Sequence, residues 1–345
     1  MDLHDAQKLW EPEPGWLNTA TFGLPAAPTL EAYRAVLEQW RLGRDIWKNW
    51  VTQAERSRTA FATLVGVPVA DVAVGAAVSQ LLAPVAEALP PGARVVVPEV
   101  EFTSNVFPWL VQEARGVRVS TVPADRLAEA VDADTDLVAF SLVQSSDGSI
   151  ARYDDIVAAA RSYGALVVVD ATQAAGWLPF DAGRADAVVA GGYKWLTAPR
   201  GTAYGYFAPQ LRERMRPSAA GWYAGRDPHA TYYGPPLRLA EDARRFDLMP
   251  SWFSYVGAAP ALELLVEVGL EAIREHDVAL ANRFLTGLDQ PPGDSAIVTV
   301  DVPGAEEKLA RAGVRAAVRA GRVRASFHLY TTEQDVDLAL TALTS

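Results

Sequence analysis

The stretch from residue 165 to residue 201 constrains the fold more than any other part of this 345-residue chain. It holds two short apolar runs, 166–169 and 187–190, which are rich in valine and bounded by glycine or polar residues. Runs of this kind are typical of strands buried on both faces of a sheet. Asp170 comes directly after the first run, and Lys194 closes the GGYK sequence after the second. The chain is therefore predicted to place an acid and an amine just past two neighbouring strands.

The carboxyl ends of the strands in an open α/β sheet are where ligands bind, so Asp170 and Lys194 are expected to face one crevice. A lysine and a carboxylate that converge in this way fit pyridoxal phosphate. That cofactor takes a lysine as a Schiff base and a carboxylate that holds its pyridine nitrogen protonated. Each residue alone has a structural alternative, because an aspartate after a strand often caps a helix and a single lysine is usually solvated.

The sequences VVVDATQAAG and AGGYKWLTAPRG resemble the class V aminotransferase group of fold-type I enzymes, which depend on pyridoxal phosphate. The group includes cysteine desulfurases, kynureninases, isopenicillin N epimerase-like proteins and the ergothioneine-pathway C–S lyase. The similarity extends from about Trp16 to the C-terminus. It implies an α/β fold with a mostly parallel seven-stranded sheet in a large lobe and a small C-terminal α/β lobe. The expected division is an N-terminal segment 1–20, a large cofactor-binding domain 21–255 and a small domain 256–345.

Strand and helix patterns along the chain agree with an α/β protein. Strands are expected at 72–74, 94–97, 117–119, 137–140, 166–169, 187–190, from 204, at 295–300 and at 322–326. Helices are expected twice between 28 and 66, at 81–89 and 153–163, as one long helix from 254, and from 332.

Composition narrows the classes of partner and chemistry. The formal net charge of −11 disfavours nucleic acid and anionic membranes, which reward clustered lysine and arginine. The chain has no cysteine, so disulfides, thiolate metal sites and a thiol nucleophile are excluded. No metal site is expected, since the four histidines lack ligand spacing. The chain has no apolar run of about 18 residues and no signal-peptide pattern at its start, so a cytoplasmic protein is expected.

The resemblance assigns cofactor contacts to residues on several predicted elements. Ala77, Val78 and Ser79 match the phosphate loop, Phe102 the ring that stacks on the pyridine, Ser145 and Gln173 the contacts of the 3-oxygen, and Tyr193 and Arg200 the phosphate region. A small-residue turn that opens a helix is a ready phosphate site, because its free N–H groups and the helix dipole favour an anion. The structural alternative for Ser79 is a simple helix N-cap, and the alternative for Arg200 is a residue that caps a helix.

Substrate contacts are implied at three further places. Arg324 opens the RASFHLYTT sequence and matches the arginine that forks the substrate's α-carboxylate. Asn18 lies in an N-terminal segment near the family's substrate entrance, and Trp222 lies in a long aromatic loop that can reach a neighbouring subunit. A homodimer is therefore expected. Met249 and Pro250 replace a Gly-Thr pair of the family, whose threonine contacts the partner's phosphate, and Ser251 is the candidate replacement.

The resemblance implies an enzyme that acts at Cα of an amino acid, with Lys194 as Schiff-base lysine and general base and Asp170 as the partner of the ring. An aminotransferase is the first expectation. The alternatives are a C–S lyase, a kynureninase-like hydrolase and an epimerase, whereas the absence of cysteine argues against a desulfurase that carries a persulfide. A catalytically lapsed scaffold is the non-enzyme alternative, and the presence of Asp170, Gln173 and Lys194 argues against it.

Overall fold

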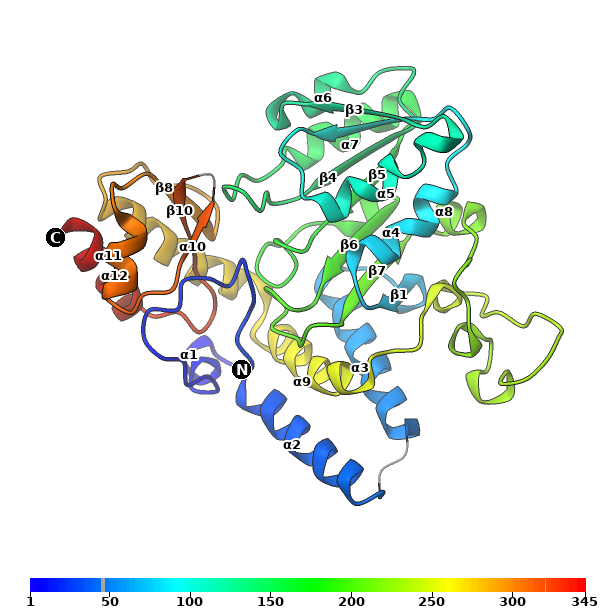
Figure 1. The fold of residues 1–345 in the computed structure, drawn as a ribbon, viewed down its shortest axis with the longest axis horizontal. Coiled ribbons are helices and arrows are strands. Elements are labelled where there is room, and N and C mark those ends of the chain that lie inside the picture. The colour runs from blue at the N-terminus through cyan, green and yellow to red at the C-terminus, as the bar shows by residue number, and fades with distance from the viewer. Residues whose placement is uncertain (45–46, 320) are drawn as a thin grey trace.

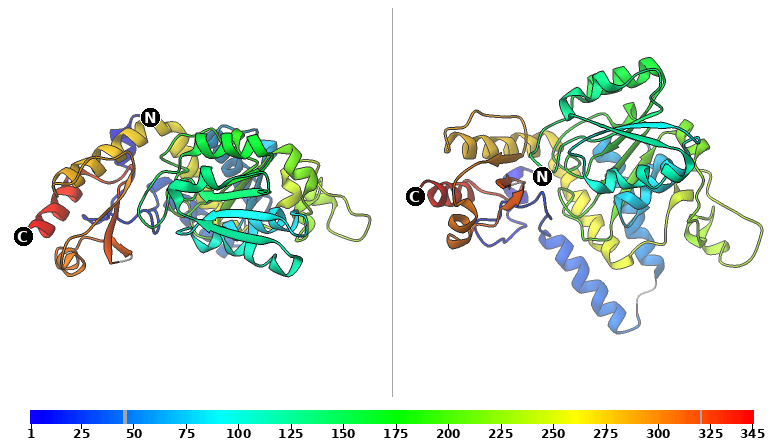
Figure 2. Two further views of the ribbon diagram at one scale, coloured as in Figure 1. Left: turned by 90° about the horizontal axis from the view of Figure 1, so that it is seen from above. Right: turned by 45° about the horizontal axis from the view of Figure 1, so that its top comes forward.

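The computed structural model describes residues 1–44, 47–319 and 321–345. Figure 1 shows a large lobe beside a small lobe that is coloured orange to red, with the N-terminal segment lying between them in both Figure 1 and Figure 2. The large lobe contains a seven-stranded sheet in the order β1-β7-β6-β5-β4-β2-β3. Its strands are β1 Val72–Gly75, β2 Arg94–Pro98, β3 Arg118–Val122, β4 Leu137–Ser141, β5 Leu166–Asp170, β6 Ala187–Gly191 and β7 Ala203–Phe207.

The sheet is mostly parallel, as predicted. Parallel pairing joins β3 to β2, β2 to β4, β4 to β5 and β5 to β6. Only β7 runs antiparallel to its neighbours, which are β6 and the edge strand β1. Successive residues of a central strand enter different cores, because side chains alternate across a sheet. Val167 and Val169 of β5 pack in one hydrophobic cluster, while Val168 packs in the cluster on the other face. Burial on both faces explains the uninterrupted valine runs.

Helices cover both faces of the large sheet. One face packs against α3, α7 and α9, and the other against α4 and α5. The bounds of the large-lobe and N-terminal helices are α1 Leu3–Gln7, α2 Ala27–Arg41, α3 Trp47–Val65, α4 Val78–Glu87, α5 Phe107–Leu110, α6 Leu127–Ala130, α7 Tyr153–Tyr163, α8 Pro209–Arg214 and α9 Trp252–Val268.

The small lobe is an antiparallel three-stranded sheet packed against helices. Its strands have the order β8-β10-β9, with bounds β8 Ile297–Val300, β9 Ala317–Arg319 and β10 Arg322–Ser326. Its helices are α10 Leu270–Thr286, α11 Ala305–Arg311 and α12 Glu333–Thr344. The long helix predicted from residue 254 is confirmed as α9, which ends at Val268 because Gly269 has a positive φ of 89° that a continuing helix does not allow; α10 follows it. The short strand β9 is an addition to the predicted strands.

The boundary between the lobes stays a prediction at residue 256. Helix α9 packs against α2 and α3, and its buried residues Tyr255 and Leu262 belong to the same cluster as the large sheet. The core of the small lobe includes Leu280 and Phe284 from α10. The connection between the lobes therefore passes along two consecutive helices.

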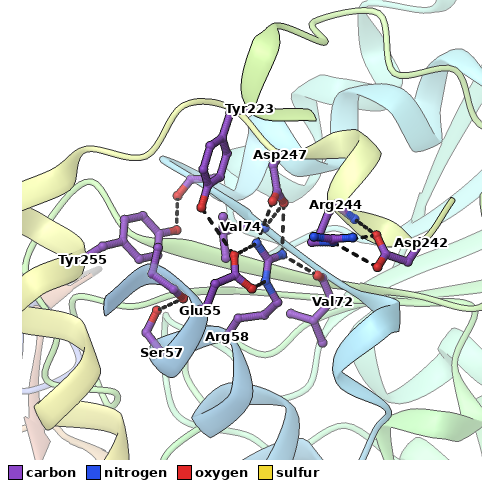
Figure 3. Close-up of polar contacts among 12 residues, drawn as sticks. Glu55, Ser57, Arg58, Val72, Val74, Tyr223, Asp242, Arg244, Asp247 and Tyr255 are labelled. Carbon is purple, nitrogen blue, oxygen red and sulfur yellow. Dashed lines mark hydrogen bonds and ion pairs between the residues drawn. The ribbon is translucent and has the colours of Figure 1, made fainter. Parts of the chain in front are cut away.

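A buried ion pair fixes the edge of the large sheet, as Figure 3 shows. The guanidinium of Arg58, from α3, donates to both carboxylate oxygens of Asp247 at 2.6 and 3.1 Å, and both side chains are 1% exposed. Arg58 also donates to Val72 O at 2.7 Å, and Val74 N donates to Asp247 at 2.8 Å. The pair thereby joins α3, the edge strand β1 and the segment before α9. A bidentate pair with further hydrogen bonds is the geometry in which two buried charges satisfy each other.

Replacing Asp247 with alanine is expected to lower the free energy of unfolding by about 3–5 kcal/mol, because it removes the buried partner of the Arg58 charge and leaves only the half-exposed Glu55 at 3.0 Å. Denaturant unfolding followed by circular dichroism measures the loss. The control is Asp337→Ala, which removes the exposed partner of Arg283 at 2.7 Å and is expected to cost less than about 1 kcal/mol. Equal losses in the two variants would show that the Arg58–Asp247 pair does not hold the sheet edge.

Candidate active site

A cavity of about 240 Å³ lies where the sheet predicts a ligand. Ser141, Asp170 and Gly191 are the last residues of β4, β5 and β6, and all three line it. The first turn of α4 closes another side. Nine of the residues predicted for the site line the cavity, namely Ala77, Val78, Phe102, Ser145, Asp170, Gln173, Tyr193, Lys194 and Arg200. The remaining lining residues are ones that the sequence patterns do not single out: Ala76, Ser104, Ser141, Thr172, Gly191, Gly201 and Thr202.

Asp170 is a buried carboxylate at the bottom of this cavity. Its Oδ1 accepts a hydrogen bond from Thr172 N at 2.8 Å, which closes a tight turn after β5. Burial raises the pKa of Asp170, while the hydrogen bonds from Thr172 and the charge of Lys194 oppose the shift. A cationic ring placed against this carboxylate would favour its ionised form, because an opposite charge lowers the pKa of an acid.

Lys194 is a buried amine, with 7% of the residue exposed. Burial lowers its pKa from the usual 10.5 to about 8; Asp170 opposes this shift, and the charges of Arg324, Arg200 and Arg319 add to it. A lysine with this pKa is neutral in roughly a tenth of molecules at pH 7, far more often than an ordinary lysine. It is then available both as a nucleophile and as a base.

The turn that carries Lys194 is held by backbone contacts on both sides. Gly23 N donates to Tyr193 O at 2.9 Å, and Thr197 N donates to Lys194 O at 3.0 Å. Gly23 packs so closely that a Cβ atom there would lie 2.1 Å from Lys194 O. Thr197 has a positive φ of 50°, which is strained for a β-branched residue and is found mostly where the surroundings impose it. The position of Lys194 is therefore imposed by its neighbours.

Two aromatic rings flank the Lys194 amine. Its Nζ lies 5.5 Å from the centroid of Phe102 and 5.8 Å from the centroid of Tyr193. The guanidinium of Arg200 lies 4.3 Å from the centroid of the Tyr193 ring. Phe102 is 46% exposed, so its ring has a free surface on which a flat ligand can stack.

Gln173 and Ser145 form a hydrogen-bonded pair at the edge of the cavity. Gln173 Nε2 donates to Ala20 O at 3.0 Å and to Ser145 Oγ at 3.3 Å. Its Oε1 accepts from Trp195 Nε1 at 2.7 Å. The side-chain amide of Gln173 is thus fully engaged within the protein, while the Ser145 hydroxyl accepts these contacts and keeps its proton to donate.

Arg324 reaches the same region from β10 of the small lobe. It is 1% exposed, and it donates to Ser145 O at 2.5 Å and to Thr21 Oγ1 at 3.0 Å. Burial lowers the pKa of Arg324 to about 10, and the charge of Arg319 adds to the shift. No carboxylate pairs with Arg324 in the part of the chain that the structure describes, and its Nε has no hydrogen-bond partner there. A buried cation of this kind fits a carboxylate ligand, because burying an unpaired charge is costly.

Four predicted residues do not line this cavity: Arg324, which contacts the lining residue Ser145, and Ser79, Asn18 and Trp222. Ser79 is exposed as the second residue of α4, and the residue at the cap position is Ala77. Asn18 pairs through its backbone with Ser326 of β10. Trp222 packs on Trp47 with ring centroids 5.3 Å apart. The cofactor role of Ser79 and the substrate roles of Asn18 and Trp222 stay predictions.

The segment that departs from the family pattern lies at the start of α9. Met249 is 58% exposed, and Ser251 occupies the cap position of α9. The Oγ of Ser251 lies 3.1 Å from the Oγ of Ser254, which donates to Arg200 O at 2.8 Å. The contact of Ser251 with a partner's phosphate stays a prediction.

The two-lobed α/β architecture matches solved structures of fold-type I enzymes. A C-DES mutant with glycine covalently linked to its PLP cofactor superposes with a TM-score of 0.88 at 22% identity, over 100% of this chain and 99% of that one. The cysteine desulfurase CsdA from Escherichia coli superposes with a TM-score of 0.84 at 20% identity, over 100% and 98%. At these identities the likeness shows the fold.

Residues 40–339 match the family model described as aminotransferase class-V. The chain therefore belongs to the class-V aminotransferase family, whose enzymes depend on pyridoxal phosphate. Among curated relatives, the uncharacterized aminotransferase YcbU of Bacillus subtilis is 30% identical over 240 residues, which cover 67% of this chain. The match spans 63% of the length of YcbU.

The residues of the cavity fit pyridoxal phosphate. Asp170 supplies a buried carboxylate, Lys194 a buried amine of lowered pKa and Phe102 a free ring face. No side chain caps the N-terminus of α4, where Ala77 and Val78 line the cavity, so this helix end suits a phosphate group. Within residues 1–44, 47–319 and 321–345, no group of three or more acidic or histidine side chains is placed to hold a metal ion. None of the helices in these ranges is long and apolar enough to cross a membrane.

The lowered pKa of Lys194 is directly measurable in the protein without cofactor. Acylation of an amine requires its neutral form, so labelling of Lys194 is expected to rise with pH around a midpoint near 8, whereas an ordinary lysine responds near 10.5. Competitive acylation over a pH series, read by peptide mass spectrometry, gives the midpoint. The three other lysines, Lys8, Lys48 and Lys308, serve as internal standards. A midpoint for Lys194 at or above 10 would contradict burial of its amine.

Proposed function

We propose that this protein is an aminotransferase that moves the amino group of an α-amino acid with the help of pyridoxal phosphate. The observation that carries the proposal is that Lys194 and Asp170 line one cavity while Arg324 contacts Ser145 at its edge, with all three side chains buried and their pKa values shifted by burial. When bound, pyridoxal phosphate supplies an aldehyde that condenses with an amine and a protonated ring that withdraws electrons from the substrate's Cα.

Each of the three residues has one task in this proposal. Asp170 would keep the ring nitrogen protonated, because a buried carboxylate and a cation stabilise each other. Arg324 holds the α-carboxylate of the substrate through paired hydrogen bonds. Lys194, once displaced by the substrate's amine, is the base that takes the proton from Cα, and its pKa of about 8 suits that task at neutral pH.

Transamination would need a side chain that both takes a proton and gives one back. Of the four lysines, Lys194 alone lines the cavity. Phe102 stands where the desulfurases carry a histidine, and its ring offers no proton. The same amine therefore serves as base and as acid, which is the minimal machinery for transamination.

A C–S lyase is the second candidate, supported by the absence of cysteine. A persulfide-carrying desulfurase needs a thiol, and the chain has none. Elimination of a sulfur group from the β-carbon needs only the base at Cα and a leaving group. The two reactions share every residue assigned above and differ in their products.

The test mixes the cofactor-loaded protein with pools of amino acids and a 2-oxo acid acceptor. Transfer of the amino group to the acceptor is the expected result, whereas pyruvate and ammonia formed without an acceptor would identify a lyase. Lys194→Ala is expected to abolish turnover, and Asp170→Asn to reduce kcat by at least about 100-fold through loss of the charge opposite the ring. Lys48→Ala, which removes an exposed lysine outside the cavity, is the control. Near-normal turnover of the Asp170→Asn variant would refute the role of Asp170.

We also propose a homodimer in which the loop around Trp222 serves the cavity of the neighbouring subunit. Trp222 lies outside the cavity of its own chain, and the loop after it exposes two large side chains, with Tyr233 89% and Leu237 82% exposed. Exposed apolar side chains on a protruding loop are typical of an interface. The net charge of −11 disfavours nucleic acid as a partner.

Mixing two inactive variants tests the shared site. Lys194→Ala protomers combined with Trp222→Ala protomers are expected to recover at most about a quarter of wild-type activity, because half of the random pairs are heterodimers with one intact site each. Activity assays before and after subunit exchange measure the recovery, and a mass-labelled protomer verifies the exchange. No recovery after complete exchange, or full activity of the Trp222→Ala variant alone, would refute the role of Trp222.

A further inference from the structure

A second pair of titratable side chains lies buried behind the Lys194 turn. His328, just after β10, and Asp277, from α10, are both fully buried. His328 Nδ1 lies 3.2 Å from Asp277 Oδ2, and His328 Nε2 lies 3.0 Å from the backbone carbonyl oxygen of Trp195. Trp195 is the residue directly after Lys194. Two elements of the small lobe thus contact the backbone next to the proposed catalytic amine.

The two partners of His328 determine where its protons lie. The carbonyl oxygen of Trp195 can only accept a hydrogen bond, so Nε2 of His328 carries a proton toward it. The pair then exists either as an imidazolium with an ionised Asp277 or as a neutral imidazole with a protonated Asp277. Both forms have the same net charge and the same Nε2–H donor. If the pair held one proton fewer, the remaining proton would lie between Nδ1 and Asp277. The lone pair of Nε2 would then face the carbonyl oxygen of Trp195, and this contact would be repulsive.

The titratable groups around this pair are few. His276, the residue before Asp277, contacts Thr331 O at 3.0 Å and Gln7 Nε2 at 3.4 Å. Tyr330 stacks edge-on against His328 with ring centroids 5.2 Å apart. Burial raises the pKa of Asp277, and its hydrogen bond with His328 and the charges of His328 and His276 oppose the shift. Oδ1 of Asp277 has no hydrogen-bond partner in the described part of the chain.

The contact on Trp195 continues toward the substrate arginine. The indole of Trp195 packs edge-on against His328, with centroids 5.2 Å apart, and its Nε1 donates to Gln173. Gln173 donates to Ser145, which in turn accepts from Arg324 at 3.3 Å. A continuous set of polar contacts therefore joins the Asp277–His328 pair, the residue after Lys194 and the arginine proposed to bind the substrate's carboxylate.

We propose that Asp277 and His328 are positioning residues: the proton that they share at Nδ1 keeps a second proton on Nε2, and this Nε2–H anchors the Trp195 carbonyl to the small lobe and thereby holds Lys194 at its place in the cavity. This inference rests on the proposed function, because the position of Lys194 affects turnover only if Lys194 is the catalytic amine. The strained Thr197 and the close packing of Gly23 show that the turn does not keep this shape by itself. The donor from His328 supplies a restraint from the other lobe.

Two substitutions of His328 separate the donor from the bulk of the side chain. In His328→Gln the amide nitrogen can take the place of Nε2 and still donate to Trp195 O. In His328→Asn the shorter amide replaces only Nδ1, so the donor to Trp195 O is lost. The contact with Asp277 changes in both variants, and the comparison between them isolates the donor.

The expected result is that His328→Asn loses kcat by on the order of 100-fold, as for a misplaced reacting group, while His328→Gln retains most of it. The acylation midpoint of Lys194 in the cofactor-free variants provides a readout that does not depend on turnover. It is expected to stay near 8 in His328→Gln and to move upward in His328→Asn, because a displaced amine becomes solvated. Equal behaviour of the two variants in both measurements would overturn the proposal.

The wild-type protein offers a measurement that needs no folded variant. The chain has four histidines, so ¹⁵N-histidine spectra of the cofactor-loaded protein resolve each ring, and the contacts of the His328 ring with the Trp195 and Tyr330 rings assign it. A proton on Nε2 is expected. An Nδ1–H tautomer with a bare Nε2 would overturn the proposal. Because this spectrum and the lysine midpoint are independent of substrate, failure of the proposed function would leave them unchanged.

Discussion

The parallel pairing of β4, β5 and β6 is the constraint on which the site depends. Their registers set Ser141 opposite Asp170, and Asp170 opposite Val189, so that the three strands end along one edge of the sheet. The chain after each strand is then forced to turn within the same small region. The topology therefore brings three features together at this edge: a carboxylate, a lysine-bearing turn and a helix N-terminus.

Burial changes the pKa values of the side chains that converge here. Desolvation is the largest cause of the shift in the pKa of Asp170, of Lys194 and of Arg324. The same removal of water that costs stability for a charged group leaves a lysine that is partly neutral and an arginine without a counter-ion. Both conditions favour a ligand that brings its own charges, which a cofactor ring and a substrate carboxylate do.

The small lobe contributes a side chain to the region of the site. Arg324 from β10 enters the region of Ser145, and the N-terminal segment lies between the lobes, where Thr21 accepts from Arg324 and Gly23 packs on the Lys194 turn (Figure 2). Any change in the distance between the lobes would therefore displace Arg324 and the lysine turn together. Such coupling suits an enzyme that must bring its substrate's carboxylate and its base into one geometry.

The sequence by itself determined the buried strands and placed Asp170 and Lys194 at and just past the ends of two of them. Valine runs such as 166–169 predict buried strands because every side chain in them must be apolar, and the residue after a buried strand lies at the carboxyl end of that strand. Helix ends are encoded less strongly, because a single glycine such as Gly269 can interrupt an otherwise continuous apolar pattern. The tertiary structure alone decided which residues meet across the lobes. The pairs His328 with Trp195 O, Gln173 with Trp195 and Arg324 with Ser145 are far apart in sequence, and their hydrogen bonds depend on lobe packing that no local pattern encodes.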